Sequence, residues 1–260
     1  MIALNILQGC TWLLTAISLA SCSHPTPTQA PAVPASIARP RCPDAMASPG
    51  EFCIDRWEDY VVELDVHGDE HPHSPFEPVE GLVVRAKTAP ATIPQGYISS
   101  VQALQACRNA GKRLCKEAEF RAACRGPAPD DWYPYGGQKR MPGYCNDGKG
   151  SMVPLLHGND PSRWTFAAFN DPRLNQLPGG LAPTGSHPRC KSPSGVWDCV
   201  GNLHEWGADP PDVNGHGRFR GGFYGDADLN GPGCLYVTSA HEPTYHDYST
   251  GFRCCADVAP

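Results

Sequence analysis

The sequence predicts an α+β fold, with one loop-rich domain that is stabilised by disulfides. Three observations support this prediction. The 260 residues include 27 glycines and 28 prolines, which interrupt helices and favour turns. The 13 cysteines are typical of an oxidising compartment, where thiols pair. Residues 42–260 contain no internal repeat and no second linker, and 40% of the chain is apolar, which is enough for one core.

The N-terminal segment predicts export. Residues 1–21 are mostly apolar, carry no charged side chain and end in Leu19-Ala20-Ser21, directly before Cys22. This ending resembles the lipobox of bacterial lipoproteins, whose cysteine is lipidated and becomes the mature N-terminus. A plain signal peptide, which would usually begin with Lys or Arg, or an anchor helix is the alternative, although the apolar run is short for a membrane span.

We therefore expect a signal peptide at residues 1–21 and a lipid anchor at Cys22, with the membrane as a partner. Ser23, in the place where a retained lipoprotein would have aspartate, favours the outer membrane of a bacterial cell envelope. Residues 22–41 contain five prolines and predict an extended tether, at ~3.1 Å per residue. The folded domain is then expected at residues 42–260. The net charge of -6 provides no basic face, so nucleic acid is not an expected partner.

Two helices and several short strands are expected within the domain. Residues 52–66 are rich in aromatic and β-branched side chains and favour a strand. Residues 99–111 begin with a serine suited to an N-cap and end with a glycine, so they predict a helix. Residues 116–126 predict a second helix, and the region up to residue 188 is largely irregular. Further strands are expected at residues 195–198, 218–224, 235–239 and 251–255.

The cysteine spacing favours disulfides over zinc. No C-x2-C pair occurs, whereas structural zinc sites usually contain one. The C-x10-C, C-x7-C and C-x8-C spacings instead predict local disulfides, each worth ~2–3 kcal/mol. The predicted pairs are Cys42–Cys53, Cys107–Cys115 and Cys190–Cys199.

Four segments, in this order, resemble the formylglycine-generating enzyme family, also called sulfatase-modifying factors. They are FCIDRWE (52–58), AGKRLCKEAEFRAACRG (110–126) with YPYG (133–136), SPSGVWDCVGNLHEW (192–206), and FRGGFY (219–224) with GFRCCAD (251–257). The resemblance covers about two hundred residues. It implies a loop-rich fold related to the C-type-lectin topology.

The resemblance also implies calcium sites. In the family the V-G-N-x-x-E-W motif helps to bind calcium, a cation that prefers oxygen ligands. Carried over, the ligands are Glu205 with Val200, Gly201 and Leu203, and Asn146 matches a ligand of a second calcium site. The alternative is that Glu205 only accepts hydrogen bonds from backbone donors.

Two longer disulfides are implied by the same resemblance, Cys124–Cys254 and Cys145–Cys234. With Cys10 removed in the signal peptide and Cys22 lipidated, eleven cysteines remain, and this scheme leaves Cys255 as a free thiol.

The resemblance breaks down at the copper site. In formylglycine-generating enzymes a Cys-x4-Cys pair follows the R-G-G motif, and its two thiolates hold copper(I) and activate oxygen. Here the first position is Asp226 and the second is Gly231 or a neighbour. Copper is therefore not an expected cofactor, and formylglycine generation is not expected.

Three functions are compatible with these residues. The first is a non-catalytic envelope module that binds a peptide, a glycan or another envelope protein, with residues 71–81 contributing to the groove. The second is a metal-dependent oxidoreductase with iron held by two histidines and a carboxylate. Its candidate ligands are His241, His246, Asp226 and Asp247. The third is a formylglycine generator that uses displaced thiols such as Cys234 and Cys255.

Overall fold

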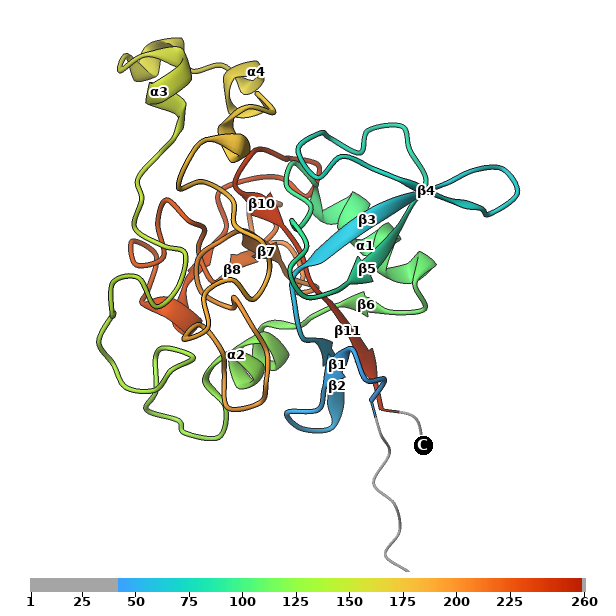
Figure 1. Cartoon of the computed structure of the whole chain (residues 1–260), viewed down its shortest axis with the longest axis vertical. Helices are drawn as coiled ribbons and strands as arrows, with labels where there is room; N and C mark the ends of the chain where they lie inside the picture. Colours follow the sequence, from blue (N-terminus) through green and yellow to red (C-terminus); the bar gives the residue numbers. More distant parts are fainter. Residues whose placement is uncertain (1–41, 259–260) are drawn as a thin grey trace, which may run out of the picture. The chain divides into compact units, whose positions relative to one another are not determined.

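Short strands and helices joined by long connections make up residues 42–258, the part of the chain that the structure, a computed structural model, describes (Figure 1). The strands are β1 (Met46–Ala47), β2 (Phe52–Asp55), β3 (Asp59–Leu64), β4 (Glu70–Pro72), β5 (Val84–Thr88), β6 (Arg113–Leu114), β7 (His204–Trp206), β8 (Phe219–Arg220), β9 (Val237–Thr238), β10 (Thr250–Gly251) and β11 (Cys254–Asp257). The α-helices are α1 (Ser100–Asn109), α2 (Glu117–Arg125), α3 (Val153–His157) and α4 (Phe166–Phe169). Three 3₁₀ helices are η1 (Pro161–Arg163), η2 (Leu174–Gln176) and η3 (Gly233–Leu235). The predicted signal peptide, Cys22 and the tether lie outside the described residues.

Three small sheets organise this part of the chain. Their strand orders are β1-β2-β11-β6, β10-β7-β8-β9 and β4-β3-β5. In the first sheet the C-terminal strand β11 lies between β2 and β6 and pairs antiparallel with both, with Cys255 opposite Ile54. The first and last segments of the domain are therefore neighbours. The predicted α+β, loop-rich fold is confirmed.

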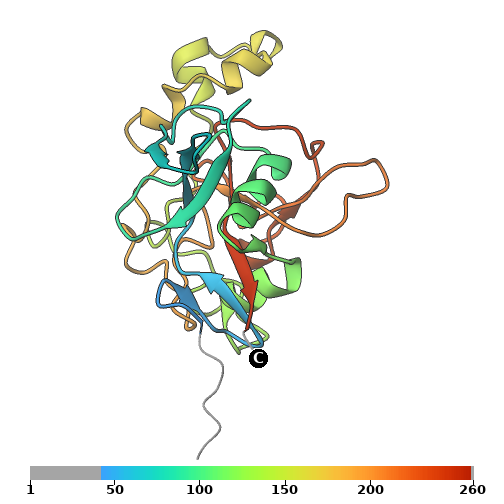
Figure 2. The same cartoon turned by 90° about the vertical axis from the view of Figure 1, so that its right-hand side faces the viewer.

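Helix α1 forms where the sequence predicts it. The Ser99 side chain accepts a hydrogen bond from the Gln102 backbone N–H, and the Gln102 side chain accepts one from the Ser99 N–H. This capping box satisfies two donors at the helix start. The buried face, with Ala103, Ala106 and Cys107, packs against β5. Figure 2 shows α1 beside the C-terminal strand.

Helix α2 also matches its prediction. It buries Phe120, Ala123 and Cys124 on one face. The helix ends at Gly126, whose φ of 69° is a backbone conformation that favours glycine. The buried aromatic ring of Phe120 belongs to the same cluster of apolar residues as Cys124.

Several predicted strands are shorter or interrupted in the structure. The strand expected at residues 52–66 is divided into β2 and β3, because Glu58 turns inward between them and is only 1% exposed. The strand expected at 218–224 ends after Arg220. Gly221 and Gly222 come next with φ of 76° and 73°, and a Cβ on Gly221 would lie 2.5 Å from the Cys199 carbonyl oxygen. Only glycine fits this close approach.

The other short strands behave similarly. Residues 195–198 form no strand, and Trp197 makes an isolated bridge with Lys191. The strand expected at 235–239 is reduced to β9, and that expected at 251–255 is divided between β10 and β11.

Five disulfides stabilise the domain, and the structure corrects most of the predicted pairs. Cys42–Cys53 forms as predicted. The pairs Cys107–Cys115, Cys190–Cys199, Cys124–Cys254 and Cys145–Cys234 do not form, and Cys255 is not free. The observed bonds are Cys107–Cys254, Cys115–Cys255, Cys124–Cys234 and Cys145–Cys190, and Cys199 is a buried free cysteine.

Topology explains the correction. Adjacent residues on a strand point to opposite faces, so in β11 Cys254 points to helix α1 and Cys255 to the other side of the sheet. Each reaches a different partner, Cys107 and Cys115. Cys107 and Cys115 are close in sequence but lie on different sides of this sheet, so they do not pair with each other.

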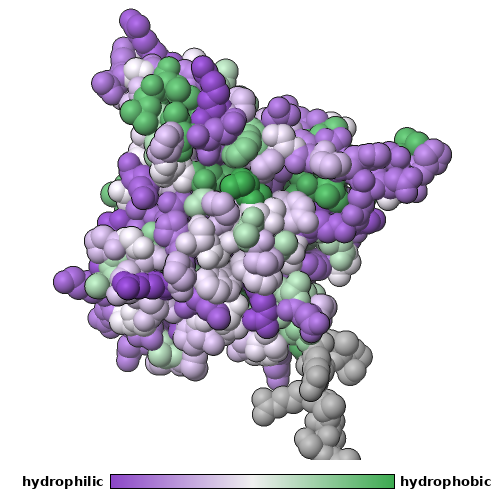
Figure 3. All heavy atoms as spheres, in the orientation of Figure 1, coloured by the Kyte–Doolittle hydropathy of each residue, from purple (hydrophilic) through white to green (hydrophobic). Residues whose placement is uncertain are grey.

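Apolar side chains are buried in three clusters around these sheets and disulfides. A few large apolar side chains stay at the surface, among them Leu155 on α3 and Phe166 on α4, which are 68% and 53% exposed. The hydrophobic area over α3 and α4 is visible in Figure 3. Within residues 42–258, no helix has the length and apolar character needed to span a membrane.

Candidate functional site

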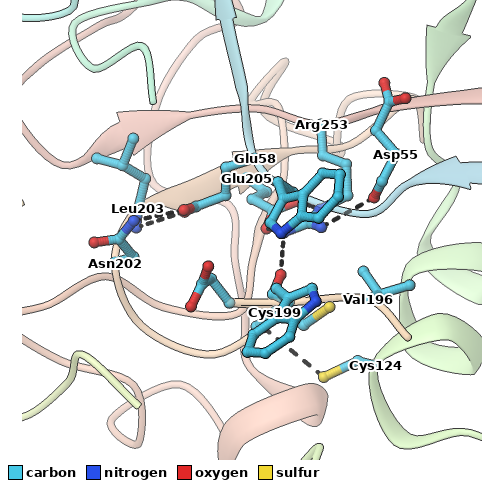
Figure 4. A network of polar contacts seen from close by, with 12 residues as sticks. Asp55, Glu58, Cys124, Val196, Cys199, Asn202, Leu203, Glu205 and Arg253 are labelled. Carbon is cyan, nitrogen blue, oxygen red and sulfur yellow. Dashed lines mark hydrogen bonds and ion pairs between the residues drawn. The ribbon is translucent and has the colours of Figure 1, made fainter. Parts of the chain in front are cut away.

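The glutamate of the V-G-N-L-H-E-W segment, Glu205, forms a buried ion pair with Arg253 (Figure 4). The Arg253 guanidinium donates to both carboxylate oxygens of Glu205, at 2.8 and 2.7 Å. It also donates to the backbone carbonyls of Asp55 and Trp197, at 3.1 and 2.8 Å. Arg253 and Glu205 are 1% and 2% exposed. The pair joins β7 to the segment before β11 and is fully satisfied by hydrogen bonds.

Glu58 holds the turn from the other side. Its carboxylate accepts hydrogen bonds from the Asn202 side-chain amide and from the Leu203 backbone N–H, the latter at 3.1 Å. Asn202 has a φ of 58°, so this tight turn depends on those contacts. Burial raises the pKa of Glu58 well above its usual range, and the neighbouring acids Asp198 and Glu205 raise it further.

The predicted calcium ligand Glu205 is the acid of this ion pair. Each of its two carboxylate oxygens accepts a hydrogen bond from the Arg253 guanidinium. In this structure Glu205 is therefore the partner of an arginine, and calcium binding through Glu205 stays a prediction. The two hydrogen bonds come from a side chain and not from the backbone donors of the alternative.

The other four predicted calcium ligands lie near one another. Gly201 approaches Asn146 so closely that a Cβ would lie 2.2 Å from the Asn146 carbonyl oxygen. That carbonyl accepts from the Asn202 N–H at 2.8 Å, and the Asn146 side-chain amide donates to Gly180 O and Asn202 Oδ1. Val200 and Leu203 flank this contact and are buried. These residues act here as a packed turn.

Asp226, at the position of the first copper cysteine, organises a turn. Its Oδ1 accepts from the backbone N–H groups of Asp228 and Leu229, at 3.0 and 3.1 Å, and its Oδ2 accepts from the Tyr236 hydroxyl at 3.0 Å. Gly231 has a φ of 104°, and a Cβ there would lie 2.9 Å from the Leu235 carbonyl oxygen. A thiol-bearing side chain would be strained at the second position.

The cysteines that remain are not available as thiolate ligands. Between Cys42 and Cys255, ten of the eleven cysteines are in disulfides. The remaining one, Cys199, is fully buried, and burial raises the pKa of its thiol to about 12. It is therefore a protonated thiol that solvent does not reach. Cys234 and Cys255, the displaced thiols of the third hypothesis, are both paired.

His204 is the centre of a hydrogen-bonded chain that the sequence did not indicate. Its Nε2 lies 3.2 Å from the Tyr236 hydroxyl, which donates to Asp226. Its Nδ1 lies 3.2 Å from the Ser249 Oγ, which lies 2.7 Å from an Asp247 carboxylate oxygen. The chain thus links two of the candidate acids, Asp226 and Asp247, through a buried imidazole.

The imidazole of His204 is uncharged. Its pKa is lowered to about 3, chiefly because burial removes water from the charged form; Asp226 acts against this, and His241 adds to the lowering. A neutral ring donates through one nitrogen and accepts through the other. Because the Ser249 hydroxyl has a single proton, it can donate either to His204 or to Asp247.

The four candidate iron ligands do not meet at one point. His241 stacks on Tyr245, with ring centroids 3.7 Å apart, and the Tyr245 hydroxyl donates to Asp247 at 2.7 Å. His246 instead contacts Asn170 and Glu80, at 2.7 and 3.2 Å.

Within residues 42–258, one set of three ligand-type side chains has all its ligand atoms within 4.8 Å of one another, namely Asp59, Cys107 and Cys254. Two of these form a disulfide, so the set is not a metal site. The predicted cluster of two histidines and a carboxylate is not assembled.

The fold and this site define a disulfide-stabilised α+β domain built around a buried glutamate–arginine pair and the R-G-G turn. The family model for the sulfatase-modifying factor enzyme 1-like domain matches residues 55–258. The chain belongs to this family. It is 28% identical over 186 residues to the formylglycine-generating enzyme of Bos taurus, and the match covers 63% of this chain and 44% of that protein. The chain thus spans less than half the length of this curated relative.

Two kinds of solved structure resemble the chain. The Major Tropism Determinant U1 variant has a TM-score of 0.46 and 14% identity, covering 83% of this chain and 53% of the other. CarF has a TM-score of 0.46 and 15% identity, covering 80% of this chain and 87% of the other.

Proposed function

We propose that the chain is a cell-envelope lipoprotein whose domain binds a ligand and does not generate formylglycine. One observation carries the proposal: within residues 42–258 no two free thiols exist. Copper(I) is held by soft sulfur ligands, and here the only unpaired thiol is buried and protonated. At the two copper positions, Asp226 instead accepts a backbone hydrogen bond within its turn, and Gly231 adopts a backbone conformation that favours glycine. Residues 42–258 therefore contain no pair of thiolates that could hold copper(I) for the reaction of the family's active members.

The proposed ligand surface lies where three segments meet. The His246 ring contacts Glu80, at the end of the 71–81 loop, and lies edge-on to the exposed ring of Phe166 in α4, with ring centroids 5.3 Å apart. Tyr245, beside it, is edge-on to Phe166 at 6.0 Å. Phe166 is 53% exposed, whereas His246, which contacts it, is only 3% exposed. An exposed aromatic side chain held by its neighbours is suited to contact a peptide, a glycan or another envelope protein. The iron hypothesis has no comparable support, because its ligands lie apart.

An activity assay tests the proposal. The purified chain, loaded with copper(I) and supplied with oxygen, is expected to produce no aldehyde on a peptide carrying the cysteine of a sulfatase. The reason is the loss of both soft ligands together. A formylglycine-generating enzyme treated in the same way is the positive control, and mass spectrometry of the peptide is the measurement. Copper-dependent aldehyde formation by this chain would refute the proposal.

The lipid anchor has its own test. Replacing Cys22 with alanine should move the protein from the membrane fraction to the soluble fraction, because the acceptor of the lipid is gone. Fractionation followed by immunodetection is the measurement, and Ser23→Ala is the control that leaves the acceptor in place. A Cys22→Ala protein that still sediments with membranes would exclude lipidation at this residue.

A further inference from the structure

A pocket of about 220 Å³ lies between two half-buried tryptophans. Its walls are largely apolar and come from four places in the sequence: Trp57, residues 90–91, residues 183–186 and Trp197. Gly185 lies between the two indole rings, because a Cβ there would be 3.4 Å from Trp57 Nε1 and 3.8 Å from Trp197 Cδ2. None of the lining residues belongs to the aromatic surface around His246, so this pocket is a separate feature.

Hydrogen bonds hold the walls of the pocket in place. The Thr184 N–H donates to the Thr92 carbonyl, and the Thr184 carbonyl accepts from the Ala91 N–H, each at 2.9 Å. The Gly185 N–H donates to the buried Asp198 carboxylate at 2.6 Å. These contacts keep Ala91 at a φ of 56°, a conformation that is uncommon outside glycine. The pocket is therefore preformed.

The pocket offers hydrogen-bond donors and few acceptors. Within residues 42–258, Trp57 and Trp197 make their hydrogen bonds through backbone groups. Neither indole nitrogen is a buried unpaired atom, so solvent reaches both N–H groups. Most backbone carbonyls of the walls already accept, namely those of Trp57, Pro90, Pro183, Thr184 and Trp197. A ligand that enters should bring acceptors and an apolar body, and few donors.

A proline-rich peptide has these properties. In the polyproline II conformation the chain makes no internal hydrogen bonds, so its carbonyl groups are free to accept. Proline has no backbone N–H, so it brings no donor that would need a partner. Its apolar ring fits aromatic-lined grooves, as in several classes of peptide-binding domain. A peptide of other residues would bring unpaired N–H groups to this pocket, and a sugar would bring several hydroxyl groups.

Two cations without acidic partners lie beside the pocket. Lys191 forms a backbone bridge with Trp197, and its Nζ lies 5.1 Å from the centre of that indole ring. The Arg56 guanidinium donates to the backbone carbonyls of Asp44 and Gly195. Within residues 42–258 neither cation forms an ion pair with a carboxylate. An acidic residue next to the prolines of a peptide would complement this charge.

We propose that this pocket binds a proline-rich peptide in the polyproline II conformation, with an acidic residue beside its prolines. One proline ring lies between the indoles of Trp57 and Trp197, in the space that the missing side chain of Gly185 leaves open. The two indole N–H groups donate to carbonyls of the peptide. Lys191 forms an ion pair with the acid.

Calorimetric titration of the full chain with the peptide acetyl-PPPPEPPPP-amide tests the site. We expect one peptide per chain and at least fivefold weaker binding in Trp57→Phe, which keeps an aromatic ring and loses the N–H donor. Trp197→Ala should weaken binding at least tenfold, because one wall is removed. Trp164→Phe is the matched control, since the Trp164 N–H already donates to the Gly158 carbonyl at 2.9 Å. Its affinity should match the wild type.

The charge contact has its own measurement. Replacing the glutamate of the peptide with glutamine should weaken binding to the wild type about two- to fivefold. The same replacement should have no effect on binding to Lys191→Met, because the ion pair needs both partners. Alanine in place of every proline, in acetyl-AAAAEAAAA-amide, should abolish binding.

Nuclear magnetic resonance tests the pocket without any change to its walls. The proline peptide should shift the indole N–H signals of Trp57 and Trp197 in the wild type. The signal of Trp206, which donates to the Ile98 carbonyl at 2.8 Å, should stay in place. Thermal melts of the variants show whether each is folded, and these shifts decide the matter where a variant is not.

Three results would overturn the site. The first is a wild-type chain that binds no stoichiometric proline peptide. The second is equal affinity in the wild type, Trp57→Phe and Trp197→Ala. The third is binding that Trp164→Phe weakens and Trp57→Phe does not, which would place the peptide on the surface around α4.

Discussion

Replacing Glu205 with glutamine should lower the free energy of unfolding by about 3–5 kcal/mol, because it leaves the buried Arg253 charge without its partner. For a domain of this size the melting temperature should fall by about 6–20 °C. Denaturant unfolding under non-reducing conditions measures the effect, since the disulfides must stay intact in both states.

A second ion pair provides the control. Glu119 also accepts from both terminal nitrogens of an arginine, Arg113, but that arginine side chain is 26% exposed. Glu119→Gln should therefore cost about 1 kcal/mol or less. Equal losses of unfolding free energy in the two variants would contradict the larger cost expected for the buried pair. A melting temperature that a chelator lowers in the wild type and leaves unchanged in Glu205→Gln would show that calcium binds through this residue.

The second large effect concerns pH. The native pKa of His204 is about 3, below the value of about 6.5 in an unfolded chain. Between these values the unfolded state binds more protons, so stability rises with pH. The contribution of His204 is fully present above about pH 6.5 and is lost as the pH falls towards 3. By the size of the shift, the loss is on the order of 4–5 kcal/mol.

His204→Gln isolates this contribution. Other groups titrate in the same range, and Asp198, whose pKa burial raises to about 6, acts in the opposite direction. The useful quantity is thus the difference in unfolding free energy between wild type and variant, measured at several pH values. That difference should shrink as the pH falls from 7 to 4. A constant difference would show that His204 does not titrate as described.

Local patterns were sufficient for the helices. The capping serine of α1 and the glycine that ends α2 act through neighbours three or four residues away, which a sequence displays directly. The order of the family motifs in the sequence similarly indicates the fold. The strands were predicted less well, because inward turns such as that at Glu58 depend on partners more than 140 residues away.

The site was harder to predict for the same reason. Neither the glutamate motif nor the later G-F-R segment by itself indicates that Glu205 and Arg253 form an ion pair. His204 lies inside the V-G-N-L-H-E-W motif, yet its burial depends on the rings of Phe219 and Tyr236, which come from later parts of the chain. The predictions for Cys107, Cys115 and Cys254 failed because their bonds form at β11, and pairing across a sheet cannot be inferred from spacing.

The position of the Cys42–Cys53 bond determines how the domain responds to a mechanical load. A pull applied to residues before Cys42 passes through this covalent bond into β2, a strand inside its sheet rather than at the edge. The next strand, β11, is itself covalently joined to α1 and to Cys115. Tension at the N-terminal end therefore meets a covalently crosslinked sheet, and strand β1 carries none of it. A domain held at the cell surface by one end would in this way resist shear without unravelling.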